Sequence, residues 1–304
     1  MHDPLELGRL GDVVDALDEV IVGKRETVEL AICCLLAKGH LLIEDVPGVG
    51  KTTLAHALAK ILGLDYQRVQ FTSDMLPADI LGVSVYDRED GAFHFHKGPV
   101  FTQLLLADEI NRATPKTQSA LLEAMEEGQV TAEGETYHLP QPFFVVATQN
   151  PLHQIGTYPL PESQLDRFLM RVAIGYPDQA SERRLLMEGD RRSLLAQLVP
   201  LAGIEHLHAW QAAVEQVHCA PALVDYVQAL LQHSRQSGNW HTGLSPRAGL
   251  GLIRAARAWA LLHDRSQVIP EHVQAVLSAV AGHRLGDHQG SDPVRTLLEA
   301  VAIP

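Results

Sequence analysis

One segment, residues 41–61, constrains the fold more than any other part of the chain. An apolar run at 41–44 leads into a loop with two glycines, Gly48 and Gly50, and apolar residues recur at helical spacing after Lys51. The order of strand, glycine-rich loop and helix predicts a parallel sheet with a phosphate-binding loop at the carboxyl end of one strand. Main-chain N–H groups and the positive end of the helix dipole would surround phosphate oxygens, and the Lys51 ammonium would reach the terminal phosphates.

The loop departs from the usual phosphate-loop pattern at its first position. Where the pattern Gly-x-x-x-x-Gly-Lys-[Ser/Thr] begins with glycine, this chain has Asp45. Because a carboxylate aimed at phosphate would repel it, we expect the Asp45 side chain to face away from a bound nucleotide. We expect Thr52 to hold a magnesium ion, and the nucleotide contacts to come from Pro47, Gly48, Val49, Gly50, Lys51, Thr52 and Thr53. The alternative, a glycine-rich turn without a ligand, is disfavoured by the strand and helix on either side.

Two carboxylates, Asp108 and Glu109, directly follow a second apolar run at residues 104–107. The carboxyl ends of parallel strands share one edge of the sheet, and ligands bind at that edge. We therefore predict that Asp108 holds magnesium through its water shell and that Glu109 orients and deprotonates the attacking water. The alternative is a strand that ends in two solvated acids. The presence of Lys51 and Thr52 in the same chain disfavours this alternative.

A third apolar run, residues 143–148, ends in the polar sequence Thr148-Gln149-Asn150. If this strand lies between the two strands described above, Asn150 comes beside the γ-phosphate and can hydrogen-bond the attacking water. The alternative is an ordinary asparagine in a turn.

The first half of the chain alternates strand-like runs with helical patterns, which predicts an α/β domain with five parallel strands. The predicted strands are residues 41–44, 66–71, 104–107, 143–148 and 169–174. Two β-hairpins interrupt this pattern, one at 82–98 with a turn at Asp90-Gly91 and one at 129–139 with a turn at Glu133-Gly134.

The strand pattern stops after residue 177, and helical patterns follow to the end. We predict helices at residues 179–188, 206–217, 221–233, 246–262 and 270–281, three of which open with proline. The chain therefore divides into an α/β domain at residues 1–177 and a smaller all-helical domain at residues 178–304.

A phosphate-transferring site also needs arginines, because phosphoryl transfer spreads negative charge over the equatorial oxygens of the transferred group and an arginine stabilises that charge. Arg167 precedes the fifth predicted strand, and Arg247 stands in the first turn of a predicted helix, where the helix dipole favours an anionic partner. These two are the best candidates, with Arg112 and Arg171 ranked below them. Each could instead form an ordinary surface ion pair.

Charge and composition narrow the class of protein. The chain has 24 Lys and Arg against 37 Asp and Glu, a net charge of -13, which makes nucleic acid an unlikely partner. Its longest uncharged apolar run, residues 30–37, is far shorter than the roughly 20 residues of a bilayer-spanning helix, so we expect no membrane span. The start lacks the features of a secretory signal, which predicts a cytoplasmic protein.

Two residue types invite a metal or a disulfide but support neither. The cysteines Cys33, Cys34 and Cys219 are odd in number and lack paired spacing, so we expect small core residues. His94 and His96 would share one strand face, but two ligands do not complete a zinc site.

Together these motifs resemble the AAA+ ATPases, and more narrowly the MoxR family, over essentially the whole chain. Besides the phosphate loop, the resemblance rests on RVQFTSDMLPADILG at residues 68–82 and DEINRATPKTQ at residues 108–118. It implies Mg²⁺ and ATP as cofactors, with Lys51 and Thr52 as Walker A and Asp108 and Glu109 as Walker B.

The resemblance also implies roles for residues outside these motifs. Asn150 becomes sensor 1, Arg247 becomes sensor 2, Arg167 becomes the arginine finger, and Val22-Gly23 becomes the segment beside adenine. The helical domain is implied to be a lid, and the two hairpins to be insertions that face a central pore.

The family's members form rings, commonly homo-hexamers, and remodel or activate partner proteins, often ones with a von Willebrand factor A domain. The resemblance therefore predicts a chaperone-like ATP hydrolase. Two alternatives stay open. One is a nucleotide-gated scaffold with negligible hydrolysis, and the other is a related motor or the ATPase subunit of a metal chelatase.

Overall fold

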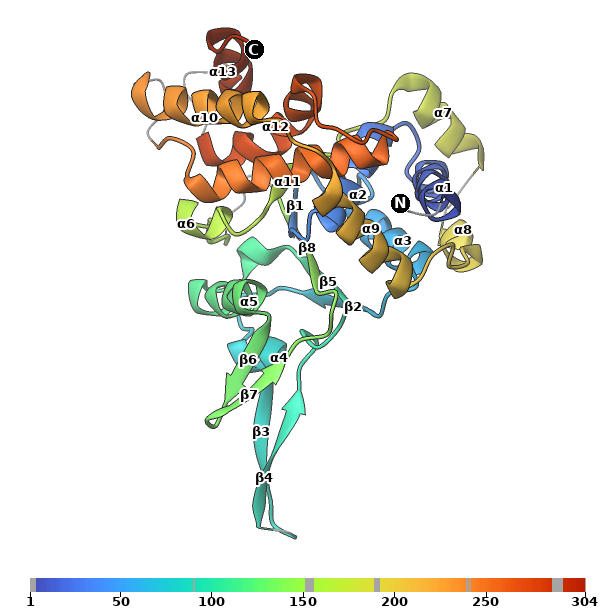
Figure 1. The fold of residues 1–304 in the computed structure, drawn as a ribbon. Helices are drawn as coiled ribbons and strands as arrows, with labels where there is room; N and C mark the ends of the chain where they lie inside the picture. Colours follow the sequence, from blue (N-terminus) through green and yellow to red (C-terminus); the bar gives the residue numbers. More distant parts are fainter. Residues whose placement is uncertain are drawn as a thin grey trace.

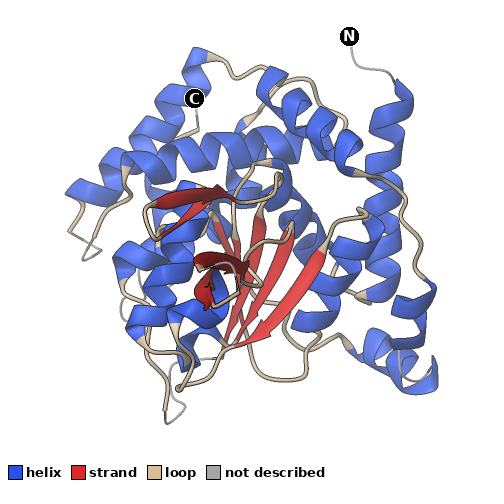
Figure 2. Ribbon diagram, turned by 90° about the horizontal axis from the view of Figure 1, so that it is seen from below, coloured by secondary structure: helices blue, strands red, loops and turns tan. Residues whose placement is uncertain are grey.

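The computed structural model describes residues 4–89, 91–150, 156–188, 192–238, 240, 242–285 and 292–303. Its centre is a five-stranded parallel sheet with the strand order β2-β5-β8-β1-β9, which confirms the predicted α/β fold. The strands are β1 (Leu41–Glu44), β2 (Tyr66–Gln70), β5 (Leu104–Asp108), β8 (Phe144–Gln149) and β9 (Met170–Val172). In Figure 2 this sheet lies among helices, so the inner strands are buried on both faces, as their uninterrupted apolar runs require.

Strand β8 lies between β5 and β1, which is the placement on which the Asn150 prediction depends. Ala147 of β8 is paired with Ala107 of β5 and with Leu42 of β1. The last residues of the three strands therefore lie side by side at the carboxyl edge of the sheet, next to the phosphate loop.

Two hydrophobic cores form on the two faces of this sheet. One contains the alternate strand residues Leu41 and Ile43 and is covered by α1 (Pro4–Val20), α2 (Arg25–Leu36) and α3 (Lys51–Ile61). The other contains Leu42 and is covered by α4 (Pro77–Leu81) and α5 (Pro115–Glu127). Helices α1 and α2 were not predicted. The α2 cysteines Cys33 and Cys34 are fully buried and free, as expected for core residues.

Both predicted hairpins are present, and the first is an arm that extends far from the sheet (Figure 1). It consists of β3 (Gly82–Asp87) and β4 (Ala92–Lys97). Its turn was predicted at Asp90-Gly91, and Asp90 lies outside the described residues. The second consists of β6 (Gln129–Ala132) and β7 (Glu135–His138). Phe95 stacks on Tyr137 with ring centroids 4.4 Å apart, and this contact joins the two hairpins.

The second half of the chain is helical, as predicted, and adds two helices to those expected. Its helices are α7 (Gln179–Glu188), α8 (Arg192–Gln197), α9 (Ile204–Gln216), α10 (Pro221–Gln236), α11 (Pro246–Leu262), α12 (Pro270–Leu285) and α13 (Pro293–Ala300). Helix α11 packs on α2, so its apolar face continues the first core. Gly251 of α11 also lies close to Leu169, the residue before β9, because a Cβ at position 251 would lie 2.8 Å from the Leu169 side chain.

One buried arginine holds α12 against the segment before β9. Arg284 pairs with the Asp166 carboxylate at 2.6 Å and donates to the carbonyls of Asp166, Phe168, Leu169 and Val280. Its side chain is 7% exposed, and the sequence pattern does not single it out. Among the described residues, we find no helix with the length and apolar character that crossing a bilayer demands.

Candidate active site

Nine of the predicted site residues line a cavity of about 360 Å³ at the carboxyl edge of the sheet. Four polypeptide segments line it: the phosphate loop with the start of α3, the end of β2, the end of β5, and the residue after β8. The cavity is lined by Pro47, Gly48, Gly50, Lys51, Thr52, Thr53, Arg68, Gln70, Asp108, Glu109 and Asn150.

The phosphate loop has the open, left-handed backbone that a phosphate cradle needs. Gly48 and Gly50 have φ values of 88° and 102°, a region that favours glycine. A Cβ at either position would meet no atom within 4 Å, so space is open beside the main chain. Both positions therefore have the backbone conformation that the predicted phosphate cradle requires, and their contact with a nucleotide stays a prediction.

Asp45 faces away from the cavity, as expected. Its Oδ2 accepts hydrogen bonds from the amides of Ile174 at 2.7 Å and Gly175 at 2.5 Å, and its Oδ1 accepts one from Val46 N at 2.7 Å. Asp45 is not among the residues with positive φ, so this position does not need glycine. The carboxylate instead ties the loop to the segment that follows β9.

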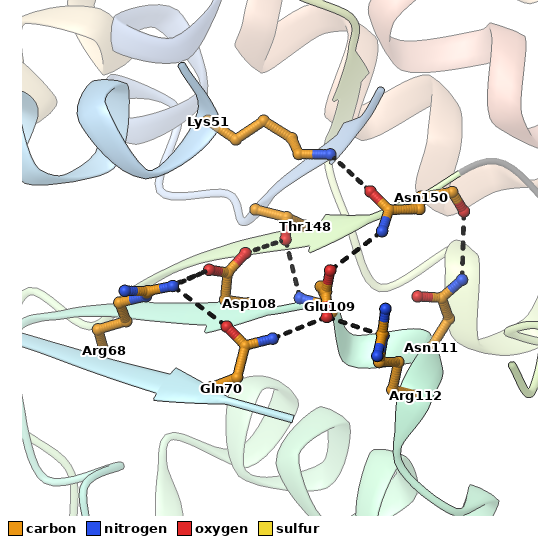
Figure 3. Close-up of polar contacts among 9 residues, drawn as sticks. All are labelled: Lys51, Arg68, Gln70, Asp108, Glu109, Asn111, Arg112, Thr148 and Asn150. Carbon is orange, nitrogen blue, oxygen red and sulfur yellow. Dashed lines mark hydrogen bonds and ion pairs between the residues drawn. The ribbon is translucent and has the colours of Figure 1, made fainter. Parts of the chain in front are cut away.

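A chain of hydrogen bonds joins the phosphate loop to the acidic pair (Figure 3). The Lys51 ammonium donates to Asn150 Oδ1 at 3.0 Å, and Asn150 Nδ2 donates to Glu109 Oε1 at 3.1 Å. Lys51 also donates to the Asp45 carbonyl at 2.5 Å. Burial lowers the pKa of Lys51, while the nearby charges of Asp45, Asp108 and Glu109 raise it. Burial is the larger effect, so the pKa of Lys51 lies below the ordinary value of a lysine.

Glu109 has an uncommon backbone conformation. Its φ of 56° and ψ of 49° lie in the left-handed region, which is strained for a glutamate by about 1–3 kcal/mol. The conformation is held by the Glu109 N–H, which donates to Thr148 Oγ1 at 2.9 Å. Glu109 Oε2 accepts from Gln70 Nε2 at 2.8 Å and pairs with Arg112 at 2.8 Å. Strain of this kind is common where a side chain must be aimed at a ligand.

Asp108 is buried at the end of β5, and both of its oxygens are bound. Thr148 Oγ1 donates to Oδ1 at 2.6 Å, and Arg68 donates to Oδ2 from its Nη2 at 2.7 Å. Arg68 also donates to Gln70 Oε1 at 3.1 Å. The guanidinium thus supplies positive charge at the carboxylate that was predicted to hold magnesium (Figure 3).

Three of these residues, Arg68, Gln70 and Thr148, were given no role from the sequence. Arg68 and Gln70 alternate on β2, and β2 pairs with β5 so that Gln70 lies opposite Asp108. Two polar residues on one face of a strand that neighbours the acidic strand would have been the sequence signal for a role of Arg68 and Gln70 in the site. Thr148 lies within the polar sequence already noted at the end of β8.

Three predicted nucleotide contacts lie outside the lining of this cavity. Val49 packs against the hydrophobic core. Val22 is buried, and Gly23 has a φ of 70° in the turn between α1 and α2. A Cβ on Gly23 would lie 2.3 Å from Ser181 Oγ of α7, so this turn lies directly against the start of the helical half. The adenine contact at Val22-Gly23 stays a prediction.

The two leading arginine candidates lie away from this cavity, in one of about 250 Å³ at the opposite edge of the sheet. His40, before β1, and Leu169, before β9, line that second cavity, which identifies the edge as the amino end of the parallel strands. Arg167 and Arg247 both pair there with Glu126, at the end of α5, at 3.1 Å. Neither arginine lines the cavity at the phosphate loop of its own chain.

The lower-ranked arginines have other partners. Arg171 pairs with Glu44 at 3.1 Å, and Arg112 pairs with Glu109 as described. The described residues include no group of three or more His, Cys, Asp or Glu arranged to hold a metal ion. A larger cavity of about 840 Å³, between Arg25, Trp259 and His272, contains none of the predicted site residues.

Comparison with known proteins agrees with this geometry. The family described as "ATPase family associated with various cellular activities (AAA)" matches residues 40–170, and the family described as "AAA lid domain" matches residues 232–301. A protein of Bacillus subtilis named YeaC, itself uncharacterised, is 45% identical over 97% of this chain and 95% of its own length.

Two further relatives carry informative names. The protein named Chaperone MoxR1 of Mycobacterium tuberculosis is 42% identical, over 92% of this chain and 76% of its own length. Protein MoxR of Paracoccus denitrificans is 34% identical, over 95% of this chain and 92% of its own length.

Solved structures reproduce the fold. A crystal structure of a provisionally assigned ATPase from Cytophaga hutchinsonii superposes with a TM-score of 0.88 at 35% identity, covering 99% of this chain and 96% of that one. An MCM homologue from Methanopyrus kandleri superposes with a TM-score of 0.61 at 18% identity, covering 94% of this chain and 62% of that one, a likeness of fold alone.

Proposed function

This chain belongs to the MoxR family of AAA+ ATPases, and from that membership we propose that it hydrolyses Mg-ATP in a ring and so remodels or activates partner proteins. The observation that carries the proposal is the contact from Lys51 through Asn150 to Glu109. It joins a cation suited to phosphate with a carboxylate suited to accept a proton from water.

The residues of the cavity fit a magnesium-bound triphosphate. The open space beside Gly48 and Gly50 suits phosphate oxygens, and Lys51 would neutralise the terminal phosphates. Thr52 and Asp108 offer a hydroxyl and a carboxylate, the oxygen ligands that Mg²⁺ prefers. Magnesium, when bound, would neutralise the negative charge that develops on the phosphates.

Glu109 and Asn150 would act on the attacking water. Asn150 already orients one oxygen of the Glu109 carboxylate, and Thr148 holds the Glu109 backbone. Glu109 would accept the proton of the water as it attacks, and Asn150 would help to orient that water. Gln70 and Arg112 bind the other carboxylate oxygen and limit its rotation.

Arg167 and Arg247 would serve the nucleotide of a neighbouring subunit. Both are partly exposed at the edge of the sheet opposite their own phosphate loop, so they are available to a second copy of the chain. In a ring, commonly a hexamer in this family, this edge would meet the phosphate-loop edge of the next subunit. An arginine delivered to the transition state raises the rate by a factor on the order of 10³ to 10⁵.

The projecting hairpins would contact the partner protein. Val83, Val85, Tyr86 and Phe93 of the first hairpin are between 47% and 66% exposed, an unusual density of apolar side chains for a solvated arm. Partners with a von Willebrand factor A domain are the ones the family suggests.

The hydrolysis proposal is tested by two substitutions in the purified chain. Lys51→Ala should abolish nucleotide binding. Glu109→Gln should keep binding and lower the rate of phosphate release by about 10²- to 10⁴-fold. Ordinary turnover in Glu109→Gln would refute the role of this carboxylate. Binding without phosphate release in the unaltered chain would instead favour the nucleotide-gated scaffold.

The ring proposal is tested by mixing subunits. Arg167→Ala and Glu109→Gln are each expected to be inactive alone. In a mixed ring, a Glu109→Gln subunit can donate its intact arginines to the intact catalytic site of an Arg167→Ala neighbour, and activity should return. The same result is expected for Arg247→Ala. No recovery at any mixing ratio would refute action across the interface.

A further inference from the structure

Glu126 joins two arginines that belong to different parts of the fold. Its Oε2 lies 3.1 Å from Arg167 Nη2, and its Oε1 lies 3.1 Å from Arg247 Nη1. Arg167 stands in the segment before β9, whereas Arg247 stands in the first turn of α11 in the helical half. One carboxylate, with one oxygen for each guanidinium, therefore sets how far apart these two side chains lie.

The charges around Glu126 explain why such a bridge is needed. Two guanidinium groups that converge on one place repel each other, and in a partly exposed site this repulsion favours their separation. Other charges at this edge are already neutralised: Arg284 by Asp166 and Lys38 by Glu215.

A third arginine lies near the pair. Arg254 follows Arg247 by seven residues, which places both on one face of α11, and it lines the same cavity. The cluster therefore keeps an excess of positive charge after Glu126 has bound its two partners. An anion can still be attracted to it.

The segment that carries Arg167 is itself firmly held. Arg284 binds the carbonyls of Asp166, Phe168 and Leu169, so the backbone on both sides of Arg167 is fixed. The N-cap of α11 is fixed in the same way, because Ser245 Oγ accepts from Ala248 N at 3.1 Å. The backbones are thus in place, and the remaining freedom is that of the two long side chains.

We propose that Glu126 is a positioning residue, which holds Arg167 and Arg247 side by side so that both reach the γ-phosphate bound by the neighbouring subunit. This inference rests on the proposed action of the arginines across the interface. Glu126 touches no reacting atom. It reduces the side-chain freedom that the arginines would otherwise lose on meeting the phosphate, and this is the usual benefit of a preorganised site.

The test is Glu126→Gln, which keeps the size of the side chain and removes its charge and one acceptor. We expect kcat for ATP hydrolysis to fall by about 10- to 100-fold. The affinity of each subunit for nucleotide, measured by binding of a fluorescent ATP analogue, should not change, because Glu126 lies at the far edge of the sheet. Glu126→Asp, which keeps the charge, should restore part of the lost activity.

Glu127→Gln is the matched control. Glu127 is the exposed neighbour at the end of the same helix, and its substitution should leave kcat unchanged. Equal unfolding midpoints for the two variants would show that the loss in Glu126→Gln is not a loss of fold.

Subunit mixing shows on which side of the interface Glu126 acts. Glu126→Gln mixed with Glu109→Gln should regain activity, because the second subunit supplies intact arginines to the first. Glu126→Gln mixed with Arg167→Ala should not, because both are defective on the same side. An unchanged or raised kcat in Glu126→Gln would overturn the inference, even if the Arg167→Ala and Glu109→Gln mixture recovers. If that mixture fails to recover, the proposed function across the interface fails first.

Discussion

Arg68 Nη2 lies 2.7 Å from Oδ2 of Asp108, so a guanidinium stands at the carboxylate that is proposed to hold magnesium. The Arg68 side chain is half-exposed and Asp108 is nearly buried, which means that the arginine can move away while the carboxylate cannot. Magnesium held there through its water shell would therefore compete with Arg68 for the same carboxylate.

Arg68→Met should lower the magnesium concentration needed for half-maximal nucleotide binding by about threefold to tenfold. The methionine keeps an apolar stem but removes the competing positive charge. A magnesium titration at fixed ATP concentration measures the effect. Arg88→Met, in the exposed first hairpin, is the control and should leave the midpoint unchanged. An equal or higher magnesium requirement in Arg68→Met would contradict this competition.

Thr148→Val should lower ATP turnover by about tenfold or more. The substitution keeps the shape of the side chain but leaves Asp108 Oδ1 and the Glu109 N–H without the partner that now binds both. Loss of such a buried partner costs about 1–3 kcal/mol, enough to release Glu109 from its left-handed conformation. Thr148→Ser retains the hydroxyl and should stay close to normal. Equal phosphate release from the two variants would exclude this role for the hydroxyl.

Arg284→Met should lower the free energy of unfolding by about 3–5 kcal/mol, because it leaves a partly buried carboxylate and several carbonyls without their donor. Denaturant-induced unfolding measures this loss. Arg295→Met provides the comparison, since Arg295 and its partner Glu299 are 77% and 66% exposed and such pairs contribute about 0–1 kcal/mol. Similar losses in the two variants would show that Arg284 does not hold the helical half in place.

The fold should lose stability in mild acid because of His40. Its Nδ1 accepts from the Val145 N–H at 3.0 Å, so the ring proton is on Nε2 and donates to the Met125 carbonyl at 3.2 Å. A second ring proton, on Nδ1, would point at the Val145 N–H and could not be accommodated there. Burial lowers the pKa of His40 to about 4.

The sign of the effect follows from the two pKa values. In the unfolded chain a histidine has a pKa of about 6.5, so between about pH 6.5 and pH 4 the unfolded chain binds a proton that the folded chain does not. The free energy of unfolding should therefore fall by about 2–3 kcal/mol as the pH drops through this window.

His40→Gln should reduce this pH dependence, because glutamine does not titrate. Unfolding curves at pH 4.5 and pH 7 measure the slope. Burial also lowers the pKa of His283 and His272, so part of the slope should persist in the variant. A slope equal to that of the unaltered chain would show that His40 is not responsible.

Much of the α/β half could be predicted from the sequence because its signals are local. Buried parallel strands such as β5 and β8 read as continuous apolar runs. The turn at Glu133-Gly134 has positive φ at both residues, a conformation that Gly134 adopts without strain. The placement of Lys51, Asp108, Glu109 and Asn150 was predictable for the same reason, since each lies at the carboxyl end of a strand or in the segment that follows one.

The remaining features depend on contacts between distant segments. Arg68 and Gln70 gain their importance from the register that brings Gln70 beside Asp108, and this register is not visible in β2 alone. The position of Arg247 depends on how α11 packs on α2 and on the approach of Gly251 to Leu169, the residue before β9. Bounds were not predicted for seven α-helices of the described chain: α1, α2, α4, α5, α6 (Glu162–Leu165), α8 and α13. Of these, α1 and α2 cover one face of the sheet, and α4 and α5 cover the other.

The stack of Phe95 on Tyr137 has a consequence for movement. The second hairpin begins directly after α5, and α5 begins shortly after the acidic pair, whereas the first hairpin joins the sheet through α4. Because the two rings are in contact, a displacement of one arm is shared with the other. A nucleotide-driven shift of β5 would thus reach a single mechanical unit made of both hairpins, rather than two independent levers.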